Sequence, residues 1–241
     1  MIRYVFIFVW TILSTITMSL AAICVAFFSR KGNGPHKVGR WWAKSILWAS
    51  GIRIQVKGVE NLDLDKPCVF MCNHQSNFDI LVLFSALPAQ FRWIAKAELF
   101  RIPLFGRAMR GAGYISIERK DRRKAIQSLR EAAEKIRSGV SVMIFPEGTR
   151  SLDGNIGEFK KGGFFLAHDA GVQIIPVVLN GTWSIMSKDS LAIKPGNVTL
   201  TILPPVNVTD YSKSDKSRLI EDVREKIVKE FESNKGLKEG N

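Results

Sequence analysis

The sequence predicts an α/β fold, a layered mixed β-sheet flanked by helices, preceded by an N-terminal motif of two membrane-associated helices. Beyond residue 50, short runs of β-forming apolar residues alternate with segments of helical periodicity, which is typical of α/β layered domains. Residues 4–28 form an uncharged apolar segment. A chain of 241 residues is long enough for one such domain plus an appendage. We therefore divide it into a membrane-associated helical hairpin over residues 1–50 and a sheet domain over residues 51–241.

The first helix is expected in the apolar segment, which lies between Arg3 and the pair Arg30 and Lys31. Its length would span a bilayer core, for which about 20 apolar residues suffice. The four Ser and Thr residues between positions 14 and 19 leave open a helical hairpin that enters one leaflet only. A cleaved signal peptide is disfavoured, because the apolar region of such a peptide is usually about 7–15 residues long.

The second helix is expected over residues 36–50, after a break rich in Gly and Pro. Its apolar side carries Trp41, Trp42, Ile46, Leu47 and Trp48, and its cationic side carries Lys37, Arg40 and Lys44. Tryptophan combined with lysine and arginine is typical of a helix at a membrane interface. The excess of Lys and Arg after residue 29 places the rest of the chain on the cytoplasmic side of an inner or plasma membrane.

The sheet domain is expected to alternate strands and helices in order. Strands are expected at residues 53–57, 68–72, 91–95, 114–119, 140–145, 172–179 and 198–203. A helix starts near Asp79, a second follows the capping residue Asp121 and ends at Gly139, and a third covers residues 162–169. The last helix, residues 214–233, carries apolar residues at helical spacing and is expected to cover the sheet.

The composition narrows the class of partner. The net charge of +13 and the isoelectric point near 9.9 indicate an acidic partner, which could be nucleic acid, anionic lipid headgroups or a substrate that carries phosphate. The Trp-rich N-terminus favours lipid over nucleic acid. The three cysteines include no Cys-x-x-Cys pair, so reduced, buried thiols are expected and a zinc site is disfavoured.

A polar loop between a buried strand and a helix contains His74 and Asp79. Five residues apart on one continuous helix, they would point roughly 140° apart. They can meet only if His74 lies in the loop and Asp79 in the first helical turn, with Ser76 or Asn77 as the cap. The carboxylate would then fix the imidazole tautomer and leave the other ring nitrogen free as a base. A polar turn with an incidental histidine is an equally good interpretation of this loop alone.

Two further loop regions carry charged side chains that could bind a phosphate. Lys96 follows one expected strand, Arg119 ends another, and the segment from Glu147 to Arg150 follows a third. An arginine can hold a phosphate by two parallel bonds, and a lysine adds a mobile point charge. A surface role for Lys96 or Arg119 is as well supported as a functional one.

Four motifs together resemble the glycerolipid acyltransferase family. The segment from Asn73 to Asp79 is similar to its first motif, His followed by four residues and Asp. The second, third and fourth motifs match Lys96 to Arg119, Phe145-Pro-Glu-Gly-Thr-Arg-Ser151, and Ile175-Pro-Val-Val-Leu179. They occur in the family's order over residues 68–180, and size and layout are similar to the bacterial members that act on lysophosphatidic acid. The combination is far more specific than His-x4-Asp alone.

The resemblance implies that residues 51–241 are a catalytic acyltransferase domain. A fatty acyl group would pass from acyl-CoA or acyl carrier protein to the sn-2 hydroxyl of lysophosphatidic acid, forming phosphatidic acid without a cofactor or metal. His74 would be the general base and Asp79 would orient it. The remaining implied sites are phosphate contacts at Lys96, Arg119 and Arg150, an acceptor pocket at Glu147, Gly148 and Thr149, and acyl-pocket lining or sheet support at Pro176. The two N-terminal helices would form a platform on the membrane surface.

Several alternatives stay open on the sequence. Cys72 could form an acyl-enzyme, because it lies two residues from His74. The acceptor could be glycerol 3-phosphate, another lysophospholipid or a lyso-aminolipid. A membrane-anchored hydrolase is disfavoured by the absence of Gly-x-Ser-x-Gly, and a non-enzymatic basic membrane adaptor would not need His74. Acyl-chain length, the donor and the oligomeric state are not encoded in these motifs.

Overall fold

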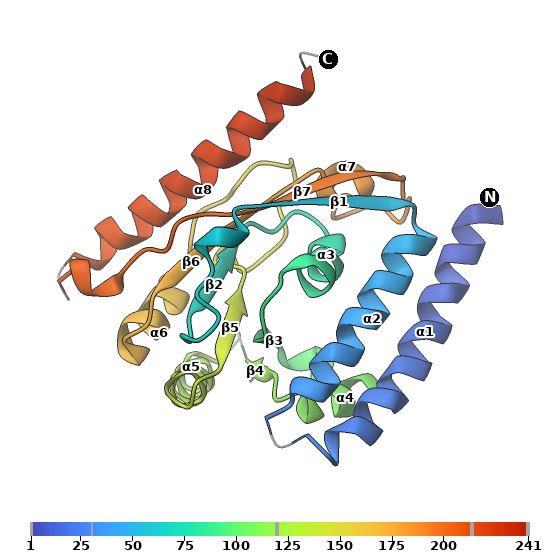
Figure 1. The fold of residues 1–241 in the computed structure, drawn as a ribbon, viewed down its shortest axis with the longest axis horizontal. Coiled ribbons are helices and arrows are strands. Elements are labelled where there is room, and N and C mark those ends of the chain that lie inside the picture. Colours follow the sequence, from blue (N-terminus) through green and yellow to red (C-terminus); the bar gives the residue numbers. More distant parts are fainter. Residues whose placement is uncertain (1, 30, 119–120, 213–214, 240–241) are drawn as a thin grey trace.

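The computed structural model of the chain describes residues 2–29, 31–118, 121–212 and 215–239. Its centre is a seven-stranded sheet of order β1-β7-β6-β2-β5-β3-β4 (Figure 1). All neighbouring strands pair in parallel except β6 and β7, which are antiparallel. The strands are β1 (Ile52–Lys57), β2 (Val69–Cys72), β3 (Phe91–Lys96), β4 (Ile115–Ile117), β5 (Ser141–Ile144), β6 (Ile174–Asn180) and β7 (Gly196–Ile202). The predicted layered, mixed α/β sheet is confirmed.

Each face of the sheet has its own apolar core. In β2, Phe70 and Cys72 belong to one cluster of buried side chains, whereas Val69 and Met71 belong to the other, as the alternation of a strand requires. α2 (Asn33–Ala49) and α3 (Phe78–Ala86) cover the first face. α5 (Arg122–Arg137), α6 (Gly162–Ala170) and α8 (Lys216–Glu239) cover the second (Figure 1). Both faces are therefore protected from water, which suits a largely parallel sheet.

Two helices confirm features that the sequence predicted: α5 has the expected N-terminal cap, and α8 has the expected buried apolar face. The Asp121 carboxylate accepts hydrogen bonds from the backbone N–H groups of Arg123 and Lys124, at 2.9 and 3.2 Å. Such a cap stabilises a helix by about 1 kcal/mol. In α8, the apolar residues spaced by four are buried against the sheet: Leu219, Val223, Ile227 and Phe231. The prediction that the last helix covers the sheet is confirmed.

The first two helices form an antiparallel pair along one edge of the molecule (Figure 1). The Arg3 guanidinium near the start of α1 (Ile2–Ala26) donates to the carbonyl of Ser50 after the end of α2, at 2.7 Å. Midway, Trp42 Nε1 donates to Thr15 Oγ1 at 3.0 Å. The Ser and Thr cluster of α1 is thereby explained, since Ser14 and Ser19 are buried and the threonine hydroxyls bond within the molecule.

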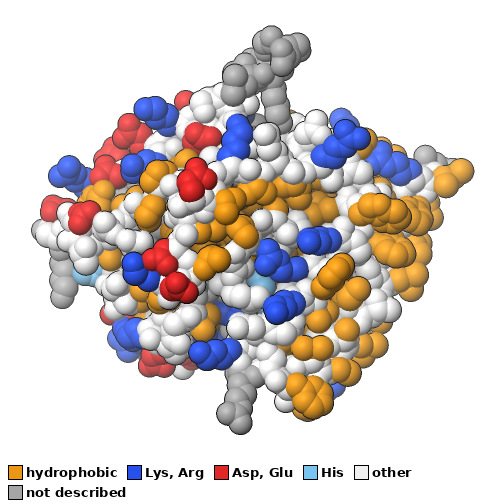
Figure 2. All heavy atoms as spheres, viewed as in Figure 1, with side chains coloured by type: hydrophobic (Ala, Val, Ile, Leu, Met, Phe, Trp, Pro, Cys, Tyr) orange, Lys and Arg blue, Asp and Glu red, His pale blue; other side chains and the backbone are white. Residues whose placement is uncertain are grey.

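The outer side of α1 presents an apolar surface. Val5, Phe8 and Leu13 are more than half exposed, and Phe27 and Phe28 after the helix are almost fully exposed. Hydrophobic side chains gather over this edge in the space-filling view (Figure 2). Within the described residues, α1 is the one helix long and apolar enough to cross a membrane.

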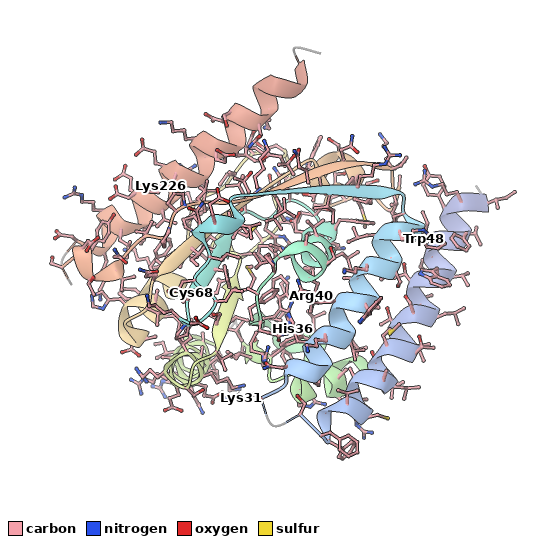
Figure 3. All side chains as sticks on the ribbon, in the orientation of Figure 1. Lys31, His36, Arg40, Trp48, Cys68 and Lys226 are labelled. Atoms are coloured by element: carbon pink, nitrogen blue, oxygen red, sulfur yellow. The ribbon has the colours of Figure 1, made fainter. Side chains whose placement is uncertain are left out.

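The side chains of α2 are distributed differently from the single apolar side that we predicted. Ile46 and Leu47 are buried against the sheet, and Trp42 packs against α1. Trp41 and Trp48 are 68% and 73% exposed. Figure 3 shows Trp48 on the side of α2 toward α1, whereas His36 and Arg40 project toward the sheet. A helix placed between two partners carries apolar residues on more than one side, and α2 packs both on α1 and on the core beside the sheet.

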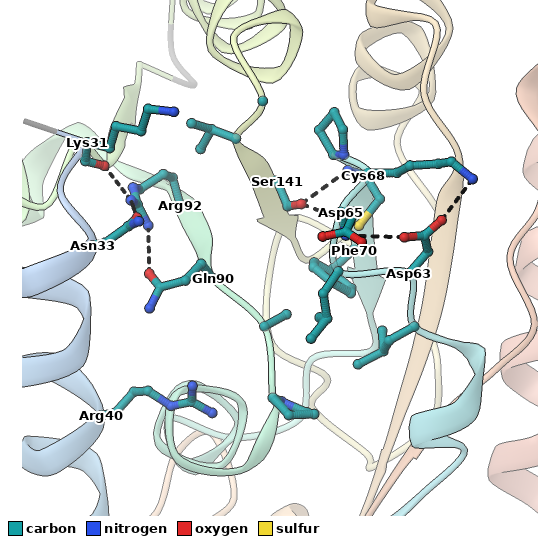
Figure 4. Close-up of a pocket in the computed structure, with 18 residues that line it drawn as sticks. Lys31, Asn33, Arg40, Asp63, Asp65, Cys68, Phe70, Gln90, Arg92 and Ser141 are labelled. Atoms are coloured by element: carbon teal, nitrogen blue, oxygen red, sulfur yellow. Dashed lines mark hydrogen bonds and ion pairs between the residues drawn. The ribbon is translucent and has the colours of Figure 1, made fainter.

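The amino ends of β2, β3 and β5 border a shallow polar hollow of about 360 Å³ on the side of α2 (Figure 4). The buried Arg92 guanidinium donates there to the carbonyls of Phe91 and Lys31 and to Asn33 Oδ1. These bonds hold the turn between α1 and α2 against the start of β3. The hollow is therefore a structural junction between the helical pair and the sheet.

Short elements account for the differences from prediction. The helices α4 (Phe105–Gly111) and α7 (Thr182–Ile185) were not predicted. Three 3₁₀ helices were also missed, at Val59–Asn61, Ala97–Arg101 and Val208–Asp210. Elements of three to seven residues span two helical turns at most, so their sequences carry little periodicity.

Candidate active site

The carboxyl ends of three parallel strands bring the predicted polar residues to one edge of the sheet. β2 lies between β5 and β6, and β3 pairs with the other side of β5. His74 lies two residues beyond β2, Glu147 lies three residues beyond β5, and Lys96 is the last residue of β3. Functional loops of such sheets gather at this edge.

His74 and Asp79 are in direct contact, as predicted. His74 Nδ1 lies 2.8 Å from Asp79 Oδ2, and the Asp79 side chain is fully buried. The same oxygen accepts the backbone N–H groups of Gln75 and Ser76, at 2.6 and 2.8 Å. Three donors on one oxygen suit an ionised carboxylate. Nδ1 then carries the ring proton, and Nε2 keeps a lone pair that can accept one.

The loop that carries His74 is held by the side chains of three of its polar residues, whereas Asn77, at the N-cap of α3, makes no side-chain cap bond. The Asn73 amide exchanges two hydrogen bonds with the backbone of Leu179 on β6, at 2.8 and 2.9 Å. Gln75 Nε2 donates to the carbonyl of Gly154, and Ser76 Oγ donates to that of Met186. Ser76 Oγ also accepts from the N–H of Phe78 at the start of α3. The loop is therefore fixed before any substrate binds.

Glu147 holds two loops together through its carboxylate. Oε1 accepts the backbone N–H of His74 at 2.7 Å, and Oε2 accepts that of Gly157 at 2.8 Å. Burial raises the pKa of this carboxyl, and the two N–H bonds oppose the rise. On the other side of His74, the N–H of Ser151 donates to its carbonyl at 2.8 Å. The main chain of His74 is thus held on both sides by the loop after β5.

Arg150 lies next to this contact, since it precedes Ser151. Its Nη1 donates to the carbonyl of Lys188 at 3.3 Å. Lys188 Nζ in turn lies 3.5 Å from Thr149 Oγ1, so a second cation joins this loop. Lys188 was not predicted, because no motif marks the loop after α7.

The other predicted residues occupy different environments. Lys96 is exposed at the end of β3, and Arg119, two residues beyond β4, lies outside the described residues. Gly148 adopts φ +73° in the turn after β5, a conformation that favours glycine. Pro176 is buried inside β6 beside Met71 of β2, which favours sheet support over a role in an acyl pocket. The roles of all four stay predictions.

Cys72 faces the core instead of the edge of the sheet. Its side chain is fully buried in the same apolar cluster as Leu83 and Phe91. Burial raises the pKa of the thiol well above its ordinary value, and the Asp79 and Glu147 carboxylates raise it further. A thiolate nucleophile is therefore disfavoured.

Within the described ranges, no three His, Cys, Asp or Glu side chains lie close enough together to hold a metal ion. The acid and base groups at this edge form one dyad and one structural carboxylate. Such a dyad can take a proton from a hydroxyl, and the adjacent cations can hold an anionic substrate.

A family model described as Acyltransferase matches residues 53–180, more than half of the chain. The chain belongs to the acyltransferase family. The match contains all four motifs, so the resemblance predicted from them is confirmed. Every contact described around the dyad lies within this family domain or in the loop after α7.

Named relatives extend the similarity beyond the family domain. A 1-acyl-sn-glycerol-3-phosphate acyltransferase of Chlamydomonas reinhardtii is 37% identical over 85% of this chain and 64% of its own length. A chloroplastic enzyme of the same name from Arabidopsis thaliana is 38% identical over 82% and 54%, and the human alpha form is 34% identical over 88% and 76%. The chain thus spans less than two thirds of the algal and plant relatives.

A solved structure shares nearly the whole fold. The crystal structure of the 1-acyl-sn-glycerophosphate acyltransferase PlsC from Thermotoga maritima superposes with a TM-score of 0.83 at 28% identity. The superposition covers 97% of this chain and 95% of that one. The N-terminal helical pair is therefore included in the shared architecture.

Proposed function

We propose that this protein transfers a fatty acyl group from a thioester donor, acyl-CoA or acyl carrier protein, to the sn-2 hydroxyl of lysophosphatidic acid. The His74–Asp79 contact at 2.8 Å is the observation that carries the proposal. It places a base with one free nitrogen beside a cationic loop. The names of the algal, plant and human relatives support the acceptor.

The reaction needs a single attack on the thioester. His74 Nε2 takes the proton of the sn-2 hydroxyl while the hydroxyl oxygen attacks the thioester carbonyl carbon. The tetrahedral intermediate then collapses, the carbon–sulfur bond breaks, and the thiolate receives the proton from His74. Asp79 stabilises the transient imidazolium through Nδ1. The products are phosphatidic acid and the free thiol of the donor.

Arg150 is the cation that we assign to the acceptor phosphate. Its loop contacts the main chain of His74 through Ser151, which supports Arg150 as the cation nearest in structure to the loop of the base. Lys96 and Lys188 are further cations at the same edge. A hydrogen bond between charged groups contributes about 1.5–3 kcal/mol.

Replacing Arg150 by alanine is therefore expected to raise KM for lysophosphatidic acid roughly 10- to 100-fold, with little change in kcat. Initial rates should be measured with lysophosphatidic acid, glycerol 3-phosphate, lysophosphatidylcholine and monoacylglycerol as acceptors, and with acyl-CoA and acyl carrier protein donors of several chain lengths. Monoacylglycerol lacks the phosphate, so its KM should not respond to the substitution.

Arg53→Ala is the matched control, because Arg53 is exposed on β1 at the far edge of the sheet and the change in net charge is the same. An equal rise in KM for monoacylglycerol would remove Arg150 from phosphate binding. Wild-type preference for an acceptor without a phosphate monoester would contradict the proposed acceptor. Release of free fatty acid in place of diacyl product would favour the hydrolase alternative.

We also propose that α1 lies in the cytoplasmic leaflet of the membrane and does not cross it. α1 packs against α2 along its length, and α2 is part of the core beside the sheet. A span across the bilayer would carry Lys37, Arg40 and Lys44 of α2 toward the hydrocarbon, where charge is costly. An in-plane helix places its exposed apolar side in the leaflet and keeps these cations near anionic headgroups.

A double substitution of Phe8 and Leu13 by aspartate should release the protein from anionic phospholipid vesicles. The two side chains are 66% and 55% exposed, so the fold should persist. Burial of two such groups contributes about 3 kcal/mol or more, roughly a hundredfold in partitioning. Sedimentation with vesicles measures the effect, and Leu64→Asp, equally exposed in the loop after β1, is the control. Unchanged binding of the double variant would contradict the in-plane placement.

A further inference from the structure

The imidazole of His74 lies flat against an aromatic ring that has no part in the proton transfer. The Phe145 ring is 3.8 Å from the His74 ring, centroid to centroid, and the two planes differ by 8°. Trp93 stacks behind Phe145 at 5.5 Å and 28°. His74 and Phe145 lie just beyond the ends of β2 and β5, and Trp93 lies within β3; β5 is the neighbour of both β2 and β3 in the sheet.

The hydrogen bond to Asp79 restrains the imidazole at one edge only. It holds Nδ1 near Asp79 Oδ2, but a hydrogen bond tolerates some bending, so the ring can still rock about its Cβ–Cγ bond, where the terminal torsion of histidine is broad. Nε2 lies in the plane of the ring on the far side, so any such rotation changes the direction of its lone pair. The nearly parallel Phe145 ring removes this freedom.

The stack also suits the charge that forms during the reaction. When His74 takes the hydroxyl proton, the imidazole becomes a cation whose partner on one face is an aromatic ring. A cation within about 6 Å of an aromatic face is attracted by the ring quadrupole. Phe145 therefore favours the protonated intermediate as well as the productive orientation.

The buried Trp93 side chain contributes through the packing of its ring and not through its N–H. It packs against Phe91 at 5.2 Å and Phe84 at 5.5 Å, which anchors the stack in the core. Among the described residues, its buried Nε1 has no hydrogen-bond partner, and an unpaired buried N–H destabilises a fold. The aromatic surface, and not the N–H, accounts for this residue.

We propose that Phe145, supported by Trp93, is a positioning residue that sets the plane of the His74 imidazole and so directs its reactive nitrogen at the acceptor. The inference rests on the proposed role of His74 as the base. It adds a constraint that Asp79 alone does not supply.

Phe145→Leu is expected to lower kcat about tenfold, a part of the roughly 10²- to 10⁴-fold that a general base contributes, with KM for both substrates little changed. Phe145→Tyr keeps the ring and should restore kcat. Trp93→Phe should retain activity, whereas Trp93→Leu should lower kcat in the same direction as Phe145→Leu. Nitrogen-15 relaxation spectra of the three histidines should show a rigid His74 ring in the wild type and a more mobile ring in Phe145→Leu, with the proton on Nδ1 in both because Asp79 is unchanged.

Phe159→Leu is the matched control, since Phe159 is a buried aromatic that stacks on Phe164 in the other core cluster. It should lower thermal stability without lowering kcat. Wild-type kcat and an unchanged His74 signal in Phe145→Leu would overturn the proposal. If that variant does not fold, Trp93→Leu decides by the same two measurements. Failure of the proposed function is distinct, because the wild type itself would then transfer no acyl group while the spectra would still report the stack.

Discussion

Replacing His74 by alanine is expected to lower kcat by roughly 10²- to 10⁴-fold while the fold persists. The alanine keeps the main-chain N–H bond to Glu147 and the carbonyl bond from Ser151. Asp79 keeps the N–H groups of Gln75 and Ser76 as partners, so no charge is left buried without a donor. Acyl transfer at saturating substrate and thermal unfolding of the same preparation measure the two effects.

Cys72→Ser is the informative comparison, because it changes the other nucleophile that the sequence offered. The thiol is fully buried, and its raised pKa keeps it protonated near neutral pH. Most of the transfer activity should remain. Near-complete inactivation of a folded Cys72→Ser protein would overturn direct attack on the thioester. Wild-type activity in His74→Ala would instead remove the general base from the mechanism and favour the adaptor alternative.

The sheet and the dyad were predictable because their signals are local. The strands are apolar runs bounded by breaks, and α8 repeats its apolar residues every four positions. His74 and Asp79 belong to one strand-to-helix junction, so their contact could be predicted as one of two equal interpretations of that loop, and the other motifs then favoured it. Predictions of this kind need only the geometry of one turn.

The supports of the dyad could not be predicted, because they join distant parts of the chain. Glu147 reaches the main chain of a residue 73 positions earlier, and a backbone N–H as partner leaves no mark in the sequence. The same holds for the ring of Phe145 against His74 and for Met186 as the partner of Ser76. The motif containing Phe145 and Glu147 was recognised from the sequence. That these two residues hold the ring and the main chain of His74 follows only from the fold.

Replacing Glu147 by glutamine is expected to destabilise the fold by about 1–3 kcal/mol and to lower kcat more than it raises the acceptor KM. Glutamine keeps the shape of the side chain but has one acceptor oxygen, whereas two backbone N–H groups need one each. Its amide NH₂ must therefore face the N–H of either His74 or Gly157, at positions that now lie 2.7 and 2.8 Å from the carboxylate. Either choice moves a loop that holds the base.

Glu158→Gln is the matched control for this prediction, because Glu158 is exposed in the same loop and the change in net charge is the same. Denaturant unfolding and steady-state kinetics of both variants separate two interpretations of Glu147. A carboxylate that only shapes the acceptor pocket, as the family resemblance implied, would give unchanged stability with a raised KM for lysophosphatidic acid. A carboxylate that joins two loops lowers stability and kcat together, because the bonds that stabilise the fold are the same bonds that place His74.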